Sequence, residues 1–192
     1  AKSGGPPVAL NPSPAVRSIE TSSTVALSWD EGNRMVSQKV YLSTNLSDVA
    51  SGADAALIEP QLADTSLNVQ VEGGQTYYWR VDTVDDEGTL KPGIAWSFQT
   101  VPSTASQPQP YNGGQFVAAM PTLTWSASLD AQGYTVVLGT DAAAVATATE
   151  GVEVTDASYS PDALVNETMY YWRVDANDGT TTQTGDVWQF TT

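Results

Sequence analysis

Two acidic stretches, one in each half of the sequence, carry the side chains that are best suited to chemistry. Clustered carboxylates can bind a hard cation such as Ca²⁺, which takes several oxygen ligands at once. The spacing does not complete a calcium loop, because Asp175-x-Asn177-x-Gly179 lacks a third acidic ligand. Hairpin tips favour Asp, Asn and Gly for backbone reasons alone, so we expect turns here, with calcium binding as the alternative. The candidate calcium ligands are Asp82, Asp85, Asp86, Asp175 and Asp178.

Glycoside hydrolysis is a second reaction in which these carboxylates could take part. A glycosidase needs one acid and one nucleophile or base on the two sides of a cleft. Neither acidic stretch has a long insertion beside it that could form a cleft wall. The chain also contains no His and no Cys, which excludes a catalytic triad, a cysteine nucleophile, a zinc site of imidazole or thiolate ligands and any disulfide. We therefore expect no catalytic residues, no enzymatic activity and no cofactor apart from the calcium alternative.

Three tyrosines are candidates for binding carbohydrate. In a strand over residues 76–84, Tyr78 points away from the expected core, Tyr171 is its counterpart in the second half, and Tyr41 is expected in the same sheet. Exposed aromatic rings can stack on sugar rings. The alternative is that Tyr78 covers the sheet together with the stem of Arg80, and single exposed aromatic residues are normal on protein surfaces.

Two arginines stand out in a chain that is poor in basic residues. Arg80 and Arg173 are each followed two positions later by an aspartate, Asp82 or Asp175. On the outer face of a strand such residues form exposed ion pairs, which contribute about 0 to 1 kcal/mol to stability. We expect these pairs to say little about function.

The net charge limits the partners that the chain can bind. It has 7 Lys and Arg against 22 Asp and Glu, a formal charge of -15, and residues 105–192 hold one basic residue against ten acidic ones. Such a charge repels phosphate backbones and anionic lipid surfaces, so we expect no nucleic acid partner. It also keeps molecules apart in solution, and we expect a monomer. No continuous apolar run approaches the roughly 18 residues of a spanning helix, which argues against membrane insertion.

The elements that must position these residues come in two copies. Each copy is domain-sized and should close its own core, so we expect one domain over residues 6–101 and another over 102–192. Prolines at matching positions place the segment 102–110 in a first strand rather than in a linker, which leaves a short junction and predicts a semi-rigid rod. The matches are Trp29 with Trp125 at an offset of 96, 77–82 with 170–175 at 93, and 96–100 with 188–192 at 92.

Short segments rich in β-branched and aromatic residues predict strands at 24–29, 39–42, 67–71 and 76–84. With no alternating long helices, the pattern is typical of an all-β fold, with two tandem antiparallel β-sandwich domains of about seven strands each. Single helical turns are expected at 45–50 and 141–146, opened by Thr44 or Asn45 and by Asp141. Alternation places Ile94 on the same face as the aromatic core residues that follow it. The expected core consists of Trp29, Tyr77, Trp79, Trp96, Phe98, Trp125, Tyr170, Trp172, Trp188 and Phe190.

Several of these features together resemble the fibronectin type III superfamily. They are the tryptophan of the second strand, Gly73-Gly74 followed by Tyr77, and the Tyr-x-Trp-x-Val alternation. The Tyr-Tyr-Trp-Arg-Val-Asp segment and the closing Trp-x-Phe-x-Thr are similar to bacterial modules found beside catalytic domains in secreted polysaccharide-degrading and cell-surface proteins. The resemblance implies that Tyr77 and Tyr170 are corner tyrosines whose hydroxyls bond to backbone. The second copy departs from it at Asn166-Glu167, which leaves the turn type there open.

The leading functional hypothesis is a non-catalytic spacer or accessory region of a larger secreted or cell-surface bacterial protein. Its partners would be the neighbouring domains of that protein. The alternatives are a carbohydrate-binding module that uses the three tyrosines on a polysaccharide, and an adhesion module that binds a surface protein through a sheet edge or loops. Because the chain has no initiator Met and no leader, we expect a processed or excised segment.

Overall fold

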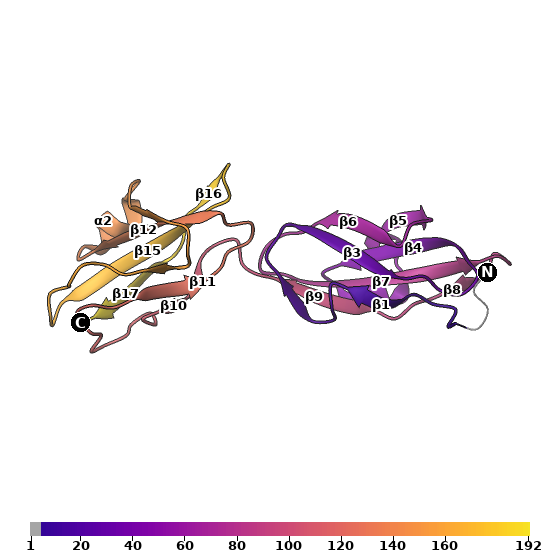
Figure 1. The fold of residues 1–192 in the computed structure, drawn as a ribbon, viewed down its shortest axis with the longest axis horizontal. Helices are drawn as coiled ribbons and strands as arrows, with labels where there is room; N and C mark the ends of the chain where they lie inside the picture. Colours follow the sequence, from indigo (N-terminus) through magenta and orange to yellow (C-terminus); the bar gives the residue numbers. More distant parts are fainter. Residues whose placement is uncertain (1–4) are drawn as a thin grey trace. The chain divides into compact units, whose positions relative to one another are not determined.

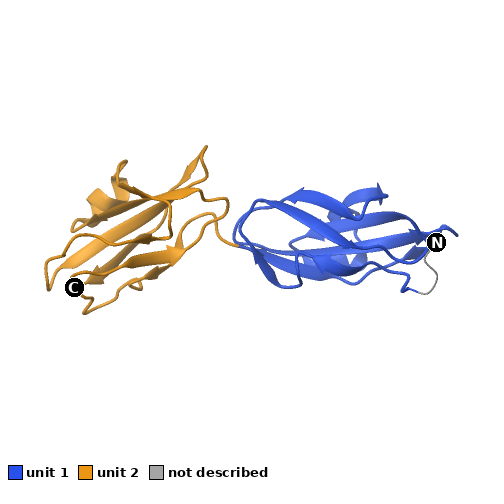
Figure 2. Ribbon diagram, in the orientation of Figure 1, with its two compact units in different colours: residues 1–100 blue, residues 101–192 orange. Residues whose placement is uncertain are grey.

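The computed structural model describes residues 5–192, whose strands are arranged as in Figure 1. By their internal contacts the residues divide into two compact units, unit 1 with residues 1–100 and unit 2 with residues 101–192 (Figure 2). No helix among residues 5–192 is both long enough and apolar enough to span a membrane. Each unit is described by itself below.

Unit 1 contains a three-stranded sheet, in the order β1-β3-β6, and a larger sheet, in the order β2-β9-β7-β4-β5, with β8 paired to β7. A single-turn helix, α1 (Leu46–Ser51), and a 3-10 turn, η1 (Asp54–Ala56), connect β4 to β5. The strands are β1 (Leu10–Ser13), β2 (Ser18–Glu20), β3 (Thr24–Asp30), β4 (Met35–Ser43), β5 (Leu57–Leu62), β6 (Ser66–Gln70), β7 (Thr76–Asp85), β8 (Leu90–Lys91) and β9 (Trp96–Thr100).

Unit 2 repeats this plan with a sheet in the order β10-β11-β14 and a larger sheet in the order β13-β12-β15-β16, in which β17 also pairs with β15. Its helix α2 (Ala142–Thr147) follows β12. The strands are β10 (Ser106–Gln109), β11 (Leu123–Ser126), β12 (Gly133–Gly139), β13 (Val152–Val154), β14 (Ser158–Tyr159), β15 (Met169–Asn177), β16 (Thr182–Gln183) and β17 (Val187–Thr191).

The predicted all-β class and the predicted strands are confirmed, and the N-terminal strand of each unit adds one feature to the expected pattern. β1 pairs with β3 in the smaller sheet, and the chain then crosses to the larger sheet, where β2 runs parallel to β9. In unit 2 a single parallel bridge between Gly114 and Phe190 stands at the place of the β2–β9 pairing. The first strand of unit 1 therefore contributes to both sheets of its sandwich. The short strands β8 and β16, which pair with β7 and β15, add one more strand to each unit, so that the nine described strands of unit 1 and the eight of unit 2 exceed the expected seven.

Each unit has its own aromatic core between its two sheets. In unit 1 the ring centroids of Trp79 and Trp96 lie 4.7 Å apart, edge to face, and in unit 2 those of Trp172 and Trp188 lie 4.8 Å apart. Edge-to-face pairs of this kind add about 0.5 to 1.5 kcal/mol beyond the burial of their area. Nine of the ten expected core residues are buried, and Tyr77 is partly buried against the same core.

Ile94 does not lie on the core face, in contrast to the expected alternation. The side chain is exposed, and β9 begins only at Trp96. The reason is that the chain before β9 leaves the strand register at Gly93, whose amide binds the carboxylate of Asp82 on β7.

Both predicted helical turns form, and each starts at a predicted cap. The Asn45 side chain accepts a hydrogen bond from the Ser47 amide, and the Asp141 side chain accepts from the amides of Ala143 and Ala144. These bonds satisfy amides that have no partner within the helix. α1 packs on β4 and β7, and α2 packs on β12 and β15 (Figure 1). The two turns therefore cover part of the outer face of the larger sheets.

Candidate functional site

The expectation of exposed Arg–Asp pairs on β7 and β15 is wrong. Only 6% of Arg80 and 1% of Asp82 is exposed, and Arg173 and Asp175 are buried as well. Alternation along the strand does place these residues on the outer face, but α1 and α2 cover that face. Each unit therefore encloses a charged pair outside its aromatic core.

In unit 2 the guanidinium of Arg173 uses all five of its N–H groups. The Nε and one Nη2 hydrogen bind the two carboxylate oxygens of Asp175, both at 2.8 Å. The remaining three hydrogens bind carbonyl oxygens at the C-terminal end of α2, at 2.6 to 2.8 Å. These carbonyls have no partner within the helix and lie at the negative end of its dipole. Arg173 therefore fastens α2 to the sheet.

In unit 1 the same arrangement is built with fewer hydrogen bonds. Arg80 Nη2 binds Asp82 Oδ2 at 2.8 Å, and Nη1 binds the carbonyl of Ala50 at 2.6 Å. The Nε lies 2.8 Å from Asp82 Oδ1, at ion-pair distance but without the alignment of a hydrogen bond. The guanidinium also lies over the ring of Tyr41, 4.9 Å from its centroid, a favourable cation–π contact.

Each buried carboxylate also accepts a hydrogen bond from a backbone amide. The amide of Gly93 donates to Asp82 at 2.9 Å, and the amide of Gly185 donates to Asp175 at 3.0 Å. A Cβ atom at either glycine would collide with the carbonyl oxygen of Val81 or Val174, so these positions require glycine. Asp82 and Asp175, two of the expected calcium ligands, are thus occupied by arginine and backbone donors.

The remaining expected calcium ligands lie in hairpin turns. Asp85 accepts from the amides of Glu87 and Thr89, and the bond from Thr89 is the main cause that lowers the pKa of this carboxyl. Asp86 pairs with Arg34 at 2.7 Å. Asp178 accepts from both the amides and the hydroxyls of Thr180 and Thr181. The described residues contain no group of three or more His, Cys, Asp or Glu side chains that could hold a metal ion.

The three candidate tyrosines do not form one binding platform. Tyr41 is buried, so it cannot stack on a ligand, and burial is the main cause that raises the pKa of its hydroxyl. It packs with Val49 and Ala56 in a small cluster beneath α1, and Tyr78 lies against this cluster. Tyr171 is partly buried, and its hydroxyl donates to the sulfur of Met169 at 3.1 Å. Tyr78 and Tyr171 keep only part of a ring free.

A shallow groove runs beside Tyr78 on the outer face of the larger sheet of unit 1. Arg17, Thr76, Ser97 and Gln99 line it together with Tyr78. Arg17 enters the groove because its amide donates to the carbonyl of Ser97 at 2.6 Å and its backbone adopts a φ of 65°. Sequence reasoning missed Arg17, since the parallel pairing that brings residues 17–20 to β9 has no local sequence pattern.

The corner tyrosines bond as the resemblance implies. The hydroxyl of Tyr77 accepts from the amide of Glu72 at 2.9 Å, and that of Tyr170 accepts from the amide of Val165 at 3.0 Å. The turn left open by Asn166-Glu167 is the same in both units, because Glu167, with a φ of 55°, takes the left-handed conformation that Gly74 has at 71°.

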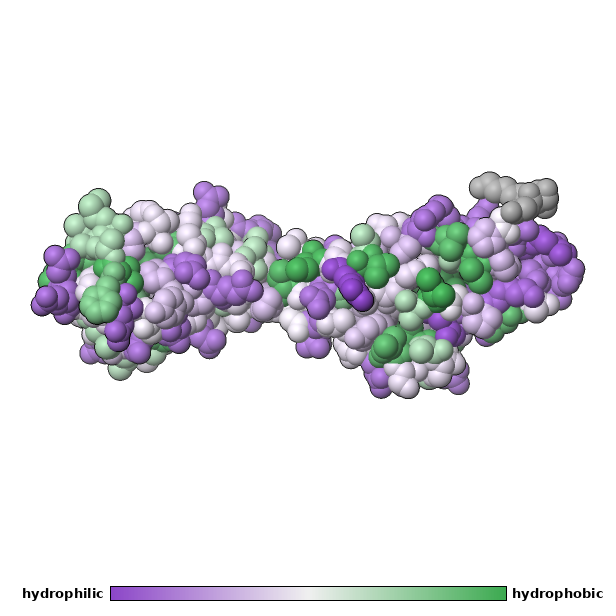
Figure 3. Space-filling model, turned by 90° about the horizontal axis from the view of Figure 1, so that it is seen from below, coloured by the Kyte–Doolittle hydropathy of each residue, from purple (hydrophilic) through white to green (hydrophobic). Residues whose placement is uncertain are grey.

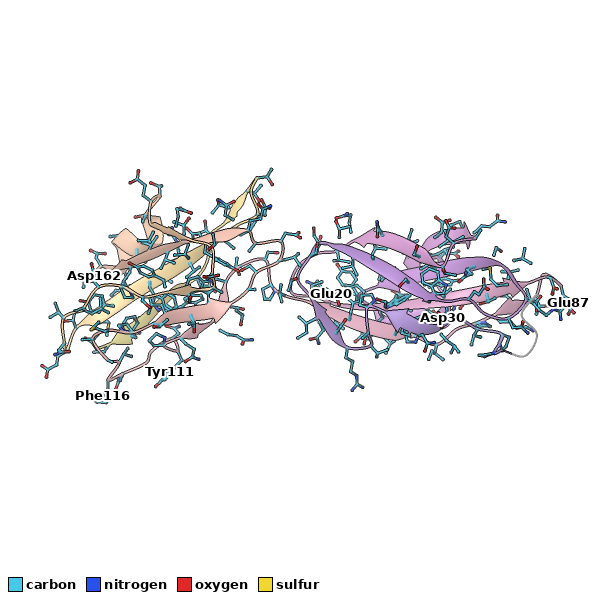
Figure 4. The ribbon with its side chains drawn as sticks, in the orientation of Figure 1. Glu20, Asp30, Glu87, Tyr111, Phe116 and Asp162 are labelled. Carbon is cyan, nitrogen blue, oxygen red and sulfur yellow. The ribbon has the colours of Figure 1, made fainter. Side chains whose placement is uncertain are left out.

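Sequence reasoning also missed two exposed aromatic side chains of unit 2, Tyr111 and Phe116, which extend from the same edge of that unit (Figure 4). They belong to the connection between β10 and β11. The one sequence feature that could have found them is the repeat itself, which aligns Ala15 with Tyr111 and Glu20 with Phe116 at the offset of 96.

No protein-family model and no curated protein matches the sequence. Three solved structures are similar to the chain at low identity. An Fn3-like protein from Clostridium thermocellum is 20% identical, with 50% of this chain and 95% of that chain covered and a TM-score of 0.39. The FN1–FN3 domains of chicken CNTN1 are 15% identical, with 97% and 65% covered and a TM-score of 0.37. A segment of two fibronectin type III domains from chicken tenascin is 12% identical, with 96% and 99% covered and a TM-score of 0.41.

The architecture of each unit is that of a fibronectin type III-like β-sandwich. In unit 1 the sheet β1-β3-β6 packs on the sheet β2-β9-β7-β4-β5 around one aromatic core, and Tyr77 forms the corner. Unit 2 has the same strands, the same core positions and the corner at Tyr170. Sandwiches of this kind carry many different functions, so function must be argued from the surfaces and polar groups of this chain.

Proposed function

We propose that the chain is a non-catalytic accessory region, a pair of β-sandwich modules that acts as a spacer within a larger secreted or cell-surface bacterial protein. The observation that carries this proposal is the burial of the Arg–Asp pair of each unit. The guanidinium of Arg173 and the carboxylate of Asp175 are both bonded within unit 2, and Arg80 and Asp82 form the corresponding buried pair in unit 1. Groups that are buried in this way hold the fold together and cannot act on a substrate.

A spacer depends on its length and its fold rather than on its surface sequence, and this property gives the test. In the parent protein, residues 1–192 are deleted or are replaced by an unrelated pair of β-sandwich modules of the same length. The deletion is expected to lower the activity or surface display of the parent, and the replacement is expected to restore it. Failure of a folded replacement to restore activity would show that the surface of this chain is needed, and the spacer proposal would be abandoned.

The groove beside Tyr78 favours a second candidate, the binding of a neutral polysaccharide. A half-buried aromatic ring bordered by guanidinium, hydroxyl and amide groups offers one apolar face and several hydrogen-bond partners, the combination found in small-ligand sites. A neutral polymer is also not repelled by the net charge of -15.

Electrophoresis in gels that contain hydroxyethylcellulose, xylan or another neutral polysaccharide tests this candidate. Tyr78→Ala and Arg17→Ala are expected to abolish any retardation. Tyr171→Ala is the matched control, because Gly113 stands at the position of Arg17 in unit 2. Retardation that persists in both groove variants, or none on any polysaccharide, rules the groove out.

A further inference from the structure

One end of unit 2 exposes a set of apolar side chains with no counterpart in unit 1. Phe116 is 93% exposed, Met120 76% and Val165 67%, and Tyr111 and Met169 are exposed as well. We call these five residues the unit 2 patch. Figure 3 shows apolar residues gathered at this end of unit 2, near the left edge of the view.

Hydrogen bonds bring the two segments that carry the patch together at the end of β17. Beside Phe116, the amide of Val117 donates to the carbonyl of Thr191 at 3.0 Å. Beside Met120, the carbonyl of Ala119 accepts from the amide of Leu164 at 2.7 Å. The carbonyl of Val165 in turn accepts from the Thr192 hydroxyl at 2.6 Å. These bonds place the segments that carry Phe116, Met120 and Val165 side by side, and Met169 on β15 pairs with Thr191 of β17 in the same region.

Unit 1 shows that the fold does not need these apolar side chains. The parallel pairing of Ser18 with Phe98 matches the bridge of Gly114 with Phe190, so the offset of 96 holds in space as well as in sequence. At the five equivalent positions unit 1 has Ala15, Glu20, Thr24, Glu72 and Thr76. The exposed parts of these apolar side chains gain nothing from burial, and a cluster of exposed apolar residues is typical of an interaction site.

The backbone conformation of Phe116 also favours a functional role for the unit 2 patch. Its φ of 59° lies in the left-handed region, which is unfavourable for a bulky side chain. The strained backbone thus coincides with an exposed aromatic ring. Strained residues of this kind persist where function needs the conformation.

The charges of unit 2 define the partner. Residues 101–192 contain one basic side chain, Arg173, which is buried against Asp175, and ten acidic ones. Asp162 and Glu167 are exposed on the segment that carries Val165, and Figure 4 labels Asp162 at the same end of unit 2 as Tyr111 and Phe116. The patch is thus apolar at its centre and acidic at its rim.

We propose that the unit 2 patch is a docking surface for a protein segment that is apolar at its centre and basic around it. Tyr, Phe and Met are enriched in protein interfaces, and opposite charges at the rim guide association. A second copy of the chain is a poor occupant, because it would bring Asp162 and Glu167 against their own counterparts. A polysaccharide is also a poor occupant, because Phe116 and Val165 offer its hydroxyls no hydrogen-bond partner, and a methionine offers only a weak sulfur acceptor.

The test uses a fluorescent, amphipathic helical peptide of Leu and Lys as the probe, with its binding to the 192-residue chain followed by anisotropy. Phe116→Asn combined with Met120→Thr removes two apolar side chains without changing the charge. We expect this variant to bind about tenfold more weakly or worse. The control is Val16→Thr combined with Ile19→Asn, two exposed apolar residues of unit 1, which should bind as the wild type does. A peptide with Glu in place of Lys should also bind at least about tenfold more weakly.

Each alternative has its own outcome in this experiment. Equal affinity of wild type and patch variant for the Lys peptide means that charge alone binds it, which overturns the proposal. Equal affinity for the Glu peptide overturns the basic rim. Retardation by hydroxyethylcellulose that is lost in the patch variant assigns the patch to carbohydrate, and sedimentation as a dimer that is lost in the variant assigns it to self-association.

Circular dichroism checks that the variant is folded, and Val165→Thr with Met169→Thr is a second variant with the same expected loss. Failure of the docking proposal would leave the spacer proposal standing, because that proposal is tested by replacing residues 1–192 in the parent protein.

Discussion

At the scale of single residues, the same buried ion pair is built in two ways. Arg173 is satisfied by hydrogen bonds alone, three of them to carbonyls of α2 and the residue after it. Arg80 has fewer hydrogen bonds and gains a contact with the ring of Tyr41, where unit 2 has Val137. The desolvation of two charges can exceed their attraction. The pair therefore fixes the position of the helical turn more than it adds to overall stability.

Arg173→Gln should strongly destabilise unit 2. The change leaves the carboxylate of Asp175 buried without its charged partner, which costs about 3 to 5 kcal/mol. Urea unfolding followed by tryptophan fluorescence measures this cost. Arg34→Gln is the control, because Arg34 pairs with Asp86 and Glu87 on the surface and should lose no more than about 1 kcal/mol. Equal costs for the two changes would contradict the role assigned to burial.

The carboxyl of Asp178 should titrate well below the ordinary range of an aspartate. The amide of Thr181 is the main cause that lowers its pKa, followed by the hydroxyl of the same residue. Because the folded-state pKa lies below the unfolded value of about 3.9, the carboxylate stabilises unit 2 above that pH, and the contribution disappears as the pH falls further toward the folded-state pKa.

Carbon NMR of the Asp178 carboxyl gives the titration directly. Thr181→Val removes one hydroxyl donor and should raise the pKa, whereas Thr122→Val, distant in sequence and bonded to Ser160, should leave it unchanged. Asp178→Asn should make unit 2 less sensitive to acid below about pH 4. If the Asp178 carboxyl of the wild type titrates with the pKa of an ordinary aspartate, the hydrogen bonds assigned to it are contradicted.

At the scale of elements, the sequence predicts the structure that neighbouring residues determine, but not the contacts between segments that are distant in the chain. The strands and both helical turns could be predicted, because alternation and caps are written in neighbouring residues. The burial of Arg80 and Tyr41 could not, because α1 covers them from another part of the chain. Ile94 was misplaced for a similar reason, since the bond from Gly93 to Asp82 bends the chain before β9. The sequence does not single out Phe116 as a candidate site residue, because one exposed aromatic residue is ordinary on a protein surface.

Gly52 should be harder to replace than another glycine with the same backbone conformation. Gly52 ends α1 with a φ of 71°, and a Cβ atom there would lie 2.5 Å from Nη2 of Arg80. Gly88 has a φ of 73° and nothing within 4 Å of such an atom. Gly88→Ala should therefore cost only the backbone strain, about 1 kcal/mol. Gly52→Ala should cost about 1 to 2 kcal/mol more, because the displaced guanidinium weakens a buried pair.

Urea unfolding of unit 1 compares the two glycine variants under the same conditions. Ala148→Gly is a further control, because Ala148 is the counterpart of Gly52 and has an extended backbone with a φ of -60°. It should lower the stability of unit 2 only by the extra flexibility of an unfolded glycine, less than about 1 kcal/mol. If Gly52→Ala and Gly88→Ala cost the same, the guanidinium of Arg80 can move aside freely.

At the scale of the whole molecule, the two units differ in surface and agree in interior. Both have closed aromatic cores and one buried ion pair. Unit 1 keeps a mixture of charges, while unit 2 carries one basic residue and ten acidic ones, a formal charge of 1 - 10 = -9 for residues 101–192. The spacer proposal rests on what the units share, and the docking proposal rests on the positions where they differ.

Unit 2 should fold by itself with its full stability. Its core residues lie between Ala105 and Phe190, within its own boundaries, and a core that is complete in one unit needs no atoms from another domain. We expect residues 101–192 to unfold in urea within about 0.5 kcal/mol of the same unit in the full chain, as independent sites do. Both measurements need the same salt concentration, about 0.15 M, because self-repulsion at a charge of -9 depends on screening.

In the full chain Arg173→Gln identifies the transition of unit 2, since it should move that transition and leave the one of unit 1 in place. A loss of more than about 2 kcal/mol on isolation, beyond the limit for independent sites, would mean that the two sandwiches stabilise each other, and independent modules would then be the wrong description.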